Sequence, residues 1–332
     1  MEGQAAYVII ATLFIAAITV FLPNPTLLTQ PVLTQYVQFN VLALIYAVVA
    51  HILARSLAER SLSLGIDHAF KVILSRGNLA RALPTLLMIS LFTFSFPSFK
   101  SHIPDFNPFT WDAQFAAFDR WLHFGWAPWE ILAGVTGYGI FTVLIDKIYY
   151  LWFPVIFAAS AIAATTPGNA ALRHRFLIAF ALSWILIGCL SAVLLSSVGP
   201  IFYDLLTGAA SEFSPLMAQL DFVNQQTPLQ ALVVRHRLWT SYLDPTGTII
   251  SGIAAMPSMH NALCVLMFLA ARHISRWLAL AAAIFAGVIF LGSIHLGWHY
   301  AVDGYAAAVL MALIWKMAGY LASAEVRRSQ PA

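Results

Sequence analysis

The motif MPSMH, residues 256–260, contains the first side chains whose types and spacing could support chemistry. Pro257 and Ser258 introduce an apolar run, so Ser258 is predicted to cap a helix by accepting a hydrogen bond from a free backbone N–H. His260 follows in the first turn, where unpaired amides and the helix dipole favour an anion. A single histidine in an apolar helix commonly serves packing. A role in catalysis for His260 therefore depends on a second group.

That second group lies in the motif HYAVD, residues 299–303, where His299 and Asp303 are four residues apart. On a helix, this spacing puts both side chains on one face. A carboxylate bonded to one imidazole nitrogen sets the tautomer and leaves the other nitrogen to react. We expect His299 to attack phosphorus and Asp303 to stabilise the imidazolium that develops. His260 would protonate the departing oxygen and then activate the incoming acceptor.

Two other interpretations remain open. His295 extends the series by one helical turn, and with His260 it could complete the ligand set of a metal-dependent membrane hydrolase. We predict instead that His295 contacts the substrate, and that the protein uses neither a metal nor another cofactor. A transporter with a buried polar cluster is the third possibility. Paired broken helices in two similar halves would favour transport, and the sequence lacks such symmetry.

The composition requires a membrane. Apolar residues make up 61% of the 332 residues and charged residues 9%, whereas soluble domains carry about a quarter charged residues. The long apolar runs do not alternate with polar residues, which favours helices over a barrel. The predicted fold class is an all-α polytopic membrane bundle of about eight transmembrane helices, at roughly 20 residues each, plus interfacial helices. The runs cover about 7–22, 39–54, 82–96, 149–164 and 176–195, and three more begin near Met259, Leu278 and His299.

Two long connections interrupt these runs. Residues 99–145 contain proline and several tryptophans, which is typical of amphipathic helices lying in the membrane interface. Within them, the apolar stretch 131–144 is short and contains three glycines, so we expect a re-entrant or interfacial piece. Residues 196–257 form the second connection. The predicted division is N-terminal membrane helices (1–98), an interfacial segment (99–145), a catalytic bundle (146–322) and a cytoplasmic tail (323–332).

Lysine and arginine positions predict the orientation, because cytoplasmic connections are enriched in both. With the amino terminus inside and its first helix retained, the inner side holds most of the 17 basic residues. The outer side holds only Lys100, Arg120, Lys147, Arg235 and Arg237. Both termini are therefore predicted in the cytoplasm. The site is predicted on the extracytoplasmic side, in what we expect to be a bacterial inner membrane. No basic run suggests nucleic acid.

The motifs PSMH at 257–260 and HYAVD at 299–303 resemble two signatures of the type-2 phosphatidic acid phosphatase superfamily. SSVGPIFY at 196–203 and IAAMPSMH at 253–260 resemble its branch containing inositol phosphorylceramide synthases. The resemblance covers residues 146–322. It implies a helical bundle without a metal cofactor, a phosphohistidine on His299, an orienting Asp303, an acid/base His260, and a lipid phosphate or phospholipid as substrate.

The sequence also departs from the superfamily's pattern. The lysine and Arg-Pro pair of the first signature are not found in register, and Ser293 replaces an arginine six residues before the nucleophile. A phosphodiester carries less charge than a monoester and needs fewer cations. The missing arginine therefore favours transfer of a phospho-headgroup between lipids. The residues predicted to bind the substrate phosphate are Ser258, Lys147, Arg235, Arg237 and His295.

Overall fold

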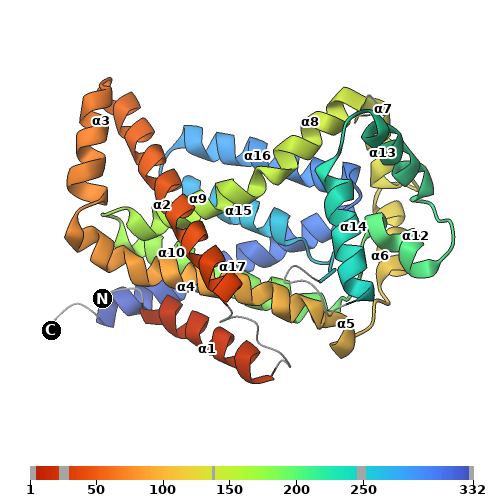
Figure 1. Ribbon diagram of the computed structural model, residues 1–332, viewed down its shortest axis with the longest axis horizontal. Coiled ribbons are helices and arrows are strands. Elements are labelled where there is room, and N and C mark those ends of the chain that lie inside the picture. Colours follow the sequence, from red (N-terminus) through yellow and green to blue (C-terminus); the bar gives the residue numbers. More distant parts are fainter. Residues whose placement is uncertain (1–4, 22–29, 137–138, 245–251, 329–332) are drawn as a thin grey trace. The chain divides into compact units, whose positions relative to one another are not determined.

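The computed structural model describes residues 5–21, 30–136, 139–244 and 252–328 (Figure 1). Within these ranges the chain forms helices and no strands, so the predicted all-α class is confirmed. The helices are α1 (Ala5–Phe21), α2 (Gln30–Glu59), α3 (Leu62–His68), η2 (Ala69–Ile73), α4 (Arg76–Ser101), α5 (Ile103–Phe106), α6 (Asp112–Leu122), α7 (Pro128–Thr136), α8 (Gly139–Tyr150), α9 (Trp152–Thr165), α10 (Ala170–Ser183), η3 (Trp184–Ser191), α11 (Ala192–Leu194), α12 (Pro200–Thr207), α13 (Ser214–Gln226), α14 (Gln230–Leu243), α15 (Met259–Ala271), α16 (Arg276–His295) and α17 (Ala301–Arg328).

Six helical segments in the described ranges are long and apolar enough to cross a membrane, and the chain is an integral membrane protein. Two shorter apolar helices, Tyr7–Ile18 and Met259–Ala271, complete the set of about eight that the sequence predicts. The six segments are Asn40–Glu59, Arg76–Ser101, Gly139–Thr165, Ala170–Leu194, Arg276–His295 and Ala301–Ser323.

The apolar stretch 131–144 does not form a span of its own. Its first part lies in α7, and its second part opens α8, which continues through α9 as the segment Gly139–Thr165. The predicted fourth span therefore begins nearly three helical turns earlier than the predicted run 149–164.

The contacts divide the chain into two compact units whose segments are interleaved. One contains Met1–Ser95, Phe153–Leu182 and Ile314–Ala332. The other, which we call unit 2, contains Phe96–Trp152 and Ser183–Leu313. The four-part division drawn from the sequence follows chain order and stays a prediction. All the candidate catalytic side chains belong to unit 2.

In unit 2, α6 packs against the start of α17. Its buried residues Asp112, Phe115, Ala116 and Asp119 recur at helical spacing, so they form one face. Phe115 and Ala116 join an apolar cluster with Phe213, Met256, Tyr300 and Val302. The two segments that carry the chemical motifs therefore share one core with an amphipathic helix from far earlier in the chain.

α15 and α16 lie side by side and are joined by a short connection (Figure 1). Because α16 runs back along α15, its end returns the chain to the end of the bundle where α15 begins. The turn at 296–300 then leads into α17. This path brings the first turns of α15 and α17 together.

Candidate active site

Ser258 caps α15 as the sequence predicts. The side chain is fully buried, and its hydroxyl accepts hydrogen bonds from the backbone N–H of Asn261 at 3.3 Å and from the Asn261 amide at 3.0 Å. The backbone N–H of Ser258 donates to the carbonyl of Asp303 at 3.3 Å, which ties the two motifs together. The contact between Ser258 and phosphate stays a prediction.

His299 and Asp303 form a buried pair at the start of α17. His299 Nδ1 lies 3.1 Å from Asp303 Oδ2, which also accepts the backbone N–H of Tyr300 at 3.1 Å. His299 is 7% exposed and Asp303 is fully buried. Burial and, less strongly, the charge of Lys100 lower the pKa of the His299 imidazole to about 3, although a hydrogen bond to the backbone of Ala255 opposes the shift. His299 is therefore neutral near pH 7, which is the state in which an imidazole nitrogen can attack.

His260 is held between two aromatic side chains. Its ring is stacked on Tyr149, with centroids 5.0 Å apart, and is tilted over Trp152, with centroids 4.2 Å apart. The indole N–H of Trp152 also donates to the carbonyl of His260 at 3.1 Å. The ring centroids of His260 and His299 are 6.2 Å apart. At this separation a single phosphate group can reach both imidazoles.

Lys100, at the end of α4, is the cation that sequence reasoning missed at this site. Its charge acts on the rings of both His260 and His299. Gly252 lets the chain before α15 approach closely, because a Cβ there would lie 2.7 Å from the carbonyl carbon of Lys100. Lys100 could have been found from the sequence, because it is a single basic residue just after the predicted span 82–96, on the side expected to hold the site.

The three predicted phosphate-binding cations have other surroundings. Lys147 is more than half exposed, and its Nζ lies 3.9 Å from the Asp146 carboxylate. Arg235 Nε donates to the carbonyl of Ile201 at 2.8 Å, and Arg237 is exposed on α14. Their contacts with phosphate stay predictions.

His295 is buried and its Nε2 lies 2.9 Å from the hydroxyl of Thr142 on α8. Its predicted contact with substrate stays a prediction. Among the described residues, no group of three or more His, Cys, Asp or Glu side chains is arranged to hold a metal ion.

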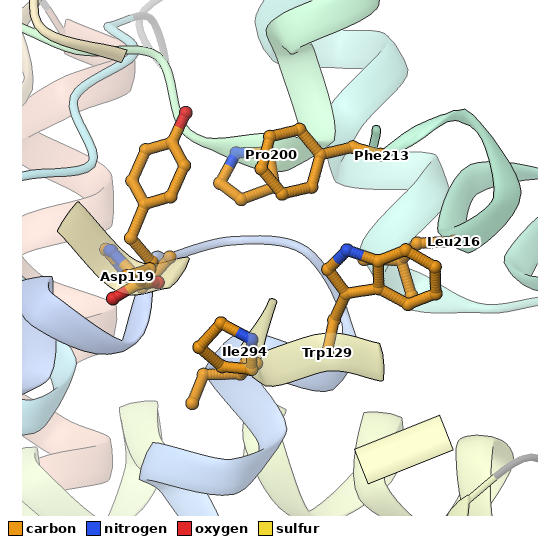
Figure 2. A pocket seen from close by; sticks show the side chains of 9 residues that line it. Asp119, Trp129, Pro200, Phe213, Leu216 and Ile294 are labelled. Carbon is orange, nitrogen blue, oxygen red and sulfur yellow. The ribbon is translucent and has the colours of Figure 1, made fainter. Parts of the chain in front are cut away.

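A small cavity lies beside His299 (Figure 2). Asp119 lies on one side of it, opposite Trp129 and Leu216, with Pro200 and Phe213 along a third side. Its volume of about 10 Å³ is close to what a single water molecule needs. With the side chains in these positions, the space is too small for a lipid phosphate.

The fold and the site define a membrane-embedded helical protein in which a His–Asp pair and a second histidine meet at two helix starts. The model of the PAP2 superfamily matches residues 113–317, more than half of the chain. The chain therefore belongs to the PAP2 superfamily. The match begins earlier than residue 146, where the resemblance began, so it includes almost all of α6.

Members of this superfamily are phosphatases and phosphotransferases, and membership places the chain among enzymes acting on phosphate-containing lipids. Neither the curated proteins nor the solved structures contain a match to this chain.

Proposed function

We propose that the protein transfers the phosphoryl group of a membrane lipid through a phosphohistidine on His299. The observation that carries this proposal is the buried His299–Asp303 pair with the His260 ring 6.2 Å away. Asp303 orients the imidazole so that its other nitrogen can attack phosphorus. Lys100 supplies positive charge where the phosphate oxygens gain negative charge.

In the first step, His299 forms an N–P bond as the bond from phosphorus to the leaving lipid oxygen breaks. His260, carrying a proton taken up together with the anionic substrate, gives that proton to the leaving oxygen. In the second step, neutral His260 takes the proton of an incoming hydroxyl, whose oxygen attacks phosphorus as the N–P bond breaks. His299 returns to its neutral state and His260 is protonated again, so the cycle closes without another reactant.

We further propose a phosphodiester donor and an alcohol acceptor, so that a phospho-headgroup moves between lipids. Ser293 supports this, because a fully buried serine stands where phosphatases of the superfamily carry an arginine. Its hydroxyl donates to the carbonyl of Phe290 at 2.7 Å. A diester has one negative charge fewer than a monoester dianion, so Lys100 with the predicted Lys147, Arg235 and Arg237 has less charge to balance.

The extracytoplasmic location of the site is part of the proposal. The end of α4 and the starts of α15 and α17 meet at the site, so all three must reach the same membrane face. We expect a cysteine in place of Arg237 to react with an impermeant maleimide added outside intact cells. A cysteine in place of Lys71 should react only after permeabilisation. The reverse pattern would overturn this orientation.

The decisive experiment uses purified wild-type protein and the His299→Ala variant, with and without EDTA. The labelled lipids are phosphatidic acid, an isoprenyl pyrophosphate, and phosphatidylinositol with ceramide as acceptor. We expect turnover by the wild-type protein to be unchanged by EDTA and to be absent in His299→Ala. An acid-labile phosphoprotein should form during turnover. Release of free phosphate would mean hydrolysis, and label on ceramide would mean headgroup transfer. Full activity in the variant would overturn the mechanism, and loss with EDTA would favour a metal-dependent hydrolase.

A further inference from the structure

α6 carries two buried carboxylates that the chemistry described above does not use. Asp112 and Asp119 are seven residues apart, so two helical turns place them on the same face. They are 5% and 3% exposed. The neighbouring cation, Arg120, is directed to Glu130 and Glu212 instead. Buried carboxylates are costly unless hydrogen bonds satisfy them, so their partners indicate their role.

The partners of Asp119 are the first amides of α17. Asp119 Oδ2 accepts the backbone N–H of Ala301 at 2.7 Å, and Oδ1 accepts that of Val302 at 2.9 Å. These residues follow His299 and Tyr300 directly. A negative charge at a helix start is also favoured by the helix dipole. Asp119 thereby sets the position and direction of the helix start from which His299 projects.

The partners of Asp112 lie on both sides of the site. Its Oδ1 accepts the hydroxyl of Tyr300 at 2.9 Å and the N–H of Gly199 at 2.9 Å, and its Oδ2 accepts the N–H of Val198 at 2.9 Å.

The loop containing Val198 and Gly199 holds the segment before Ser258 in turn. The carbonyl of Ser197 accepts the N–H of Ala255 at 2.9 Å, and the hydroxyl of Ser197 accepts the N–H of Met256 at 3.2 Å. One carboxylate of α6 thus links the turn of His299 to the segment that leads to His260.

We propose that α6 is a positioning element for catalysis, in which Asp112 and Asp119 hold the His299 turn in register with His260. This inference rests on the proposed function, since register matters only if both histidines act on one phosphate. A misplacement of about 1 Å is enough to lower a rate by about 100-fold. Both aspartates act through other residues and need not touch substrate.

Unit 2 contains a matched control for Asp119. Asp146 is also fully buried, and its carboxylate accepts the backbone N–H of Gln230 at 3.0 Å and of Ala231 at 2.9 Å. It therefore caps α14 with the same geometry. α14 carries neither histidine, only the predicted phosphate-binding Arg235 and Arg237, whose displacement would raise KM rather than lower kcat. A purely structural role predicts equal consequences for Asp119→Asn and Asp146→Asn, whereas a positioning role predicts different ones.

The test compares kcat, KM and the melting temperature of both variants in detergent micelles. The probes are labelled phosphatidic acid for hydrolysis and phosphatidylinositol with ceramide for transfer. We expect Asp119→Asn to lower kcat by about 10- to 100-fold and to change KM by less than about threefold. Asp146→Asn should keep kcat within about twofold while both variants melt at lower temperature. Equal kcat in the two variants would overturn the proposal.

Tyr300→Phe keeps the test decisive if Asp119→Asn does not fold. It removes only the hydroxyl that Asp112 accepts and leaves the ring beside Phe115 and Phe213. We expect kcat to fall, and Asp112→Asn combined with Tyr300→Phe to cost less than the product of the single effects. An unchanged kcat in Tyr300→Phe would contradict a positioning role for α6. So would a double variant whose loss of kcat equals the product of the two single losses.

The wild-type protein separates this inference from the proposed function. Turnover that depends on His299, with normal kcat in the α6 variants, would remove the positioning role and leave the mechanism intact. Absence of any turnover dependent on His299 would overturn both.

Discussion

Two helices of unit 2 begin with the same device. α14 begins where Asp146 accepts the amides of Gln230 and Ala231, and α17 begins where Asp119 accepts those of Ala301 and Val302. In both, a buried aspartate from a distant helix stabilises the helix start by charge and hydrogen bonding. Only α17 has a histidine and its orienting carboxylate in the adjoining turn. The same interaction that anchors α14 can therefore also orient a reactive group when it occurs at the start of α17.

The largest effect in this comparison should come from the nucleophile itself. His299→Ala should lower kcat by about 10⁴-fold or more, because it removes the imidazole proposed to form the N–P bond. The measurement is steady-state turnover together with trapping of labelled phosphoprotein. A His260→Ala variant that still forms phosphoprotein but releases it slowly would match the assigned roles, whereas label retained in His299→Ala would contradict them.

The second largest effect should come from Lys100, the cation beside His299. Lys100→Met should lower kcat/KM by about 10- to 1,000-fold, because one charge that stabilises the developing oxyanion is lost. Lys147→Met, which changes an exposed lysine beside the α14 cap, is the matched control. An equal loss in both variants would place Lys147 at the phosphate, as the sequence predicts.

Lowering the pH should protonate Asp119, the carboxylate that caps α17. Burial is the main cause that raises the pKa of Asp119 to about 6; the amides of Ala301 and Val302 oppose the shift and the charge of Asp303 favours it. As pH falls through 6, Asp119 becomes neutral and its hold on α17 weakens, so kcat should fall. Since His299, with its pKa of about 3, stays neutral there, this acidic decline should be smaller in Asp119→Asn.

His123, which directly follows α6, also acts on Asp119, and Tyr305 on α17 is close enough to experience the charge of Asp119. Stability should change in the opposite direction. A carboxyl whose pKa is raised from 3.8 in the unfolded chain contributes stability at low pH that is lost as pH rises through about 6. Identical pH profiles for kcat in wild type and Asp119→Asn would show that this decline belongs to another group.

The smallest effect should come from a cap without a distant carboxylate. Ser258→Ala removes the hydroxyl that accepts the Asn261 amide and should cost about 1 kcal/mol of stability. If the serine also contacts phosphate, as the sequence predicts, KM will rise as well. A melting curve and a Michaelis plot on one preparation separate the two roles, and an unchanged melting temperature would contradict the capping role.

Local sequence was a good guide where the relevant interactions are local. The membrane class follows from composition, the Ser258 cap from its place before an apolar run, and the His299–Asp303 pair from its four-residue spacing. Boundaries were less well predicted. The stretch 131–144 was expected to form one interfacial or re-entrant piece, but it divides between α7 and a long segment that continues to Thr165.

Composition and motif spacing were enough to predict a helical membrane protein with two histidines and an aspartate near helix starts. The groups that surround these side chains depend on the fold. Lys100 ends a helix nearly 200 residues before His299, and Tyr300 bonds to Asp112 across 188 positions. Chain connectivity does not constrain such pairs, so no spacing encodes them. They form because burying an apolar cluster brings α6 and α17 together, and because carboxylates buried with that cluster must find hydrogen-bond donors.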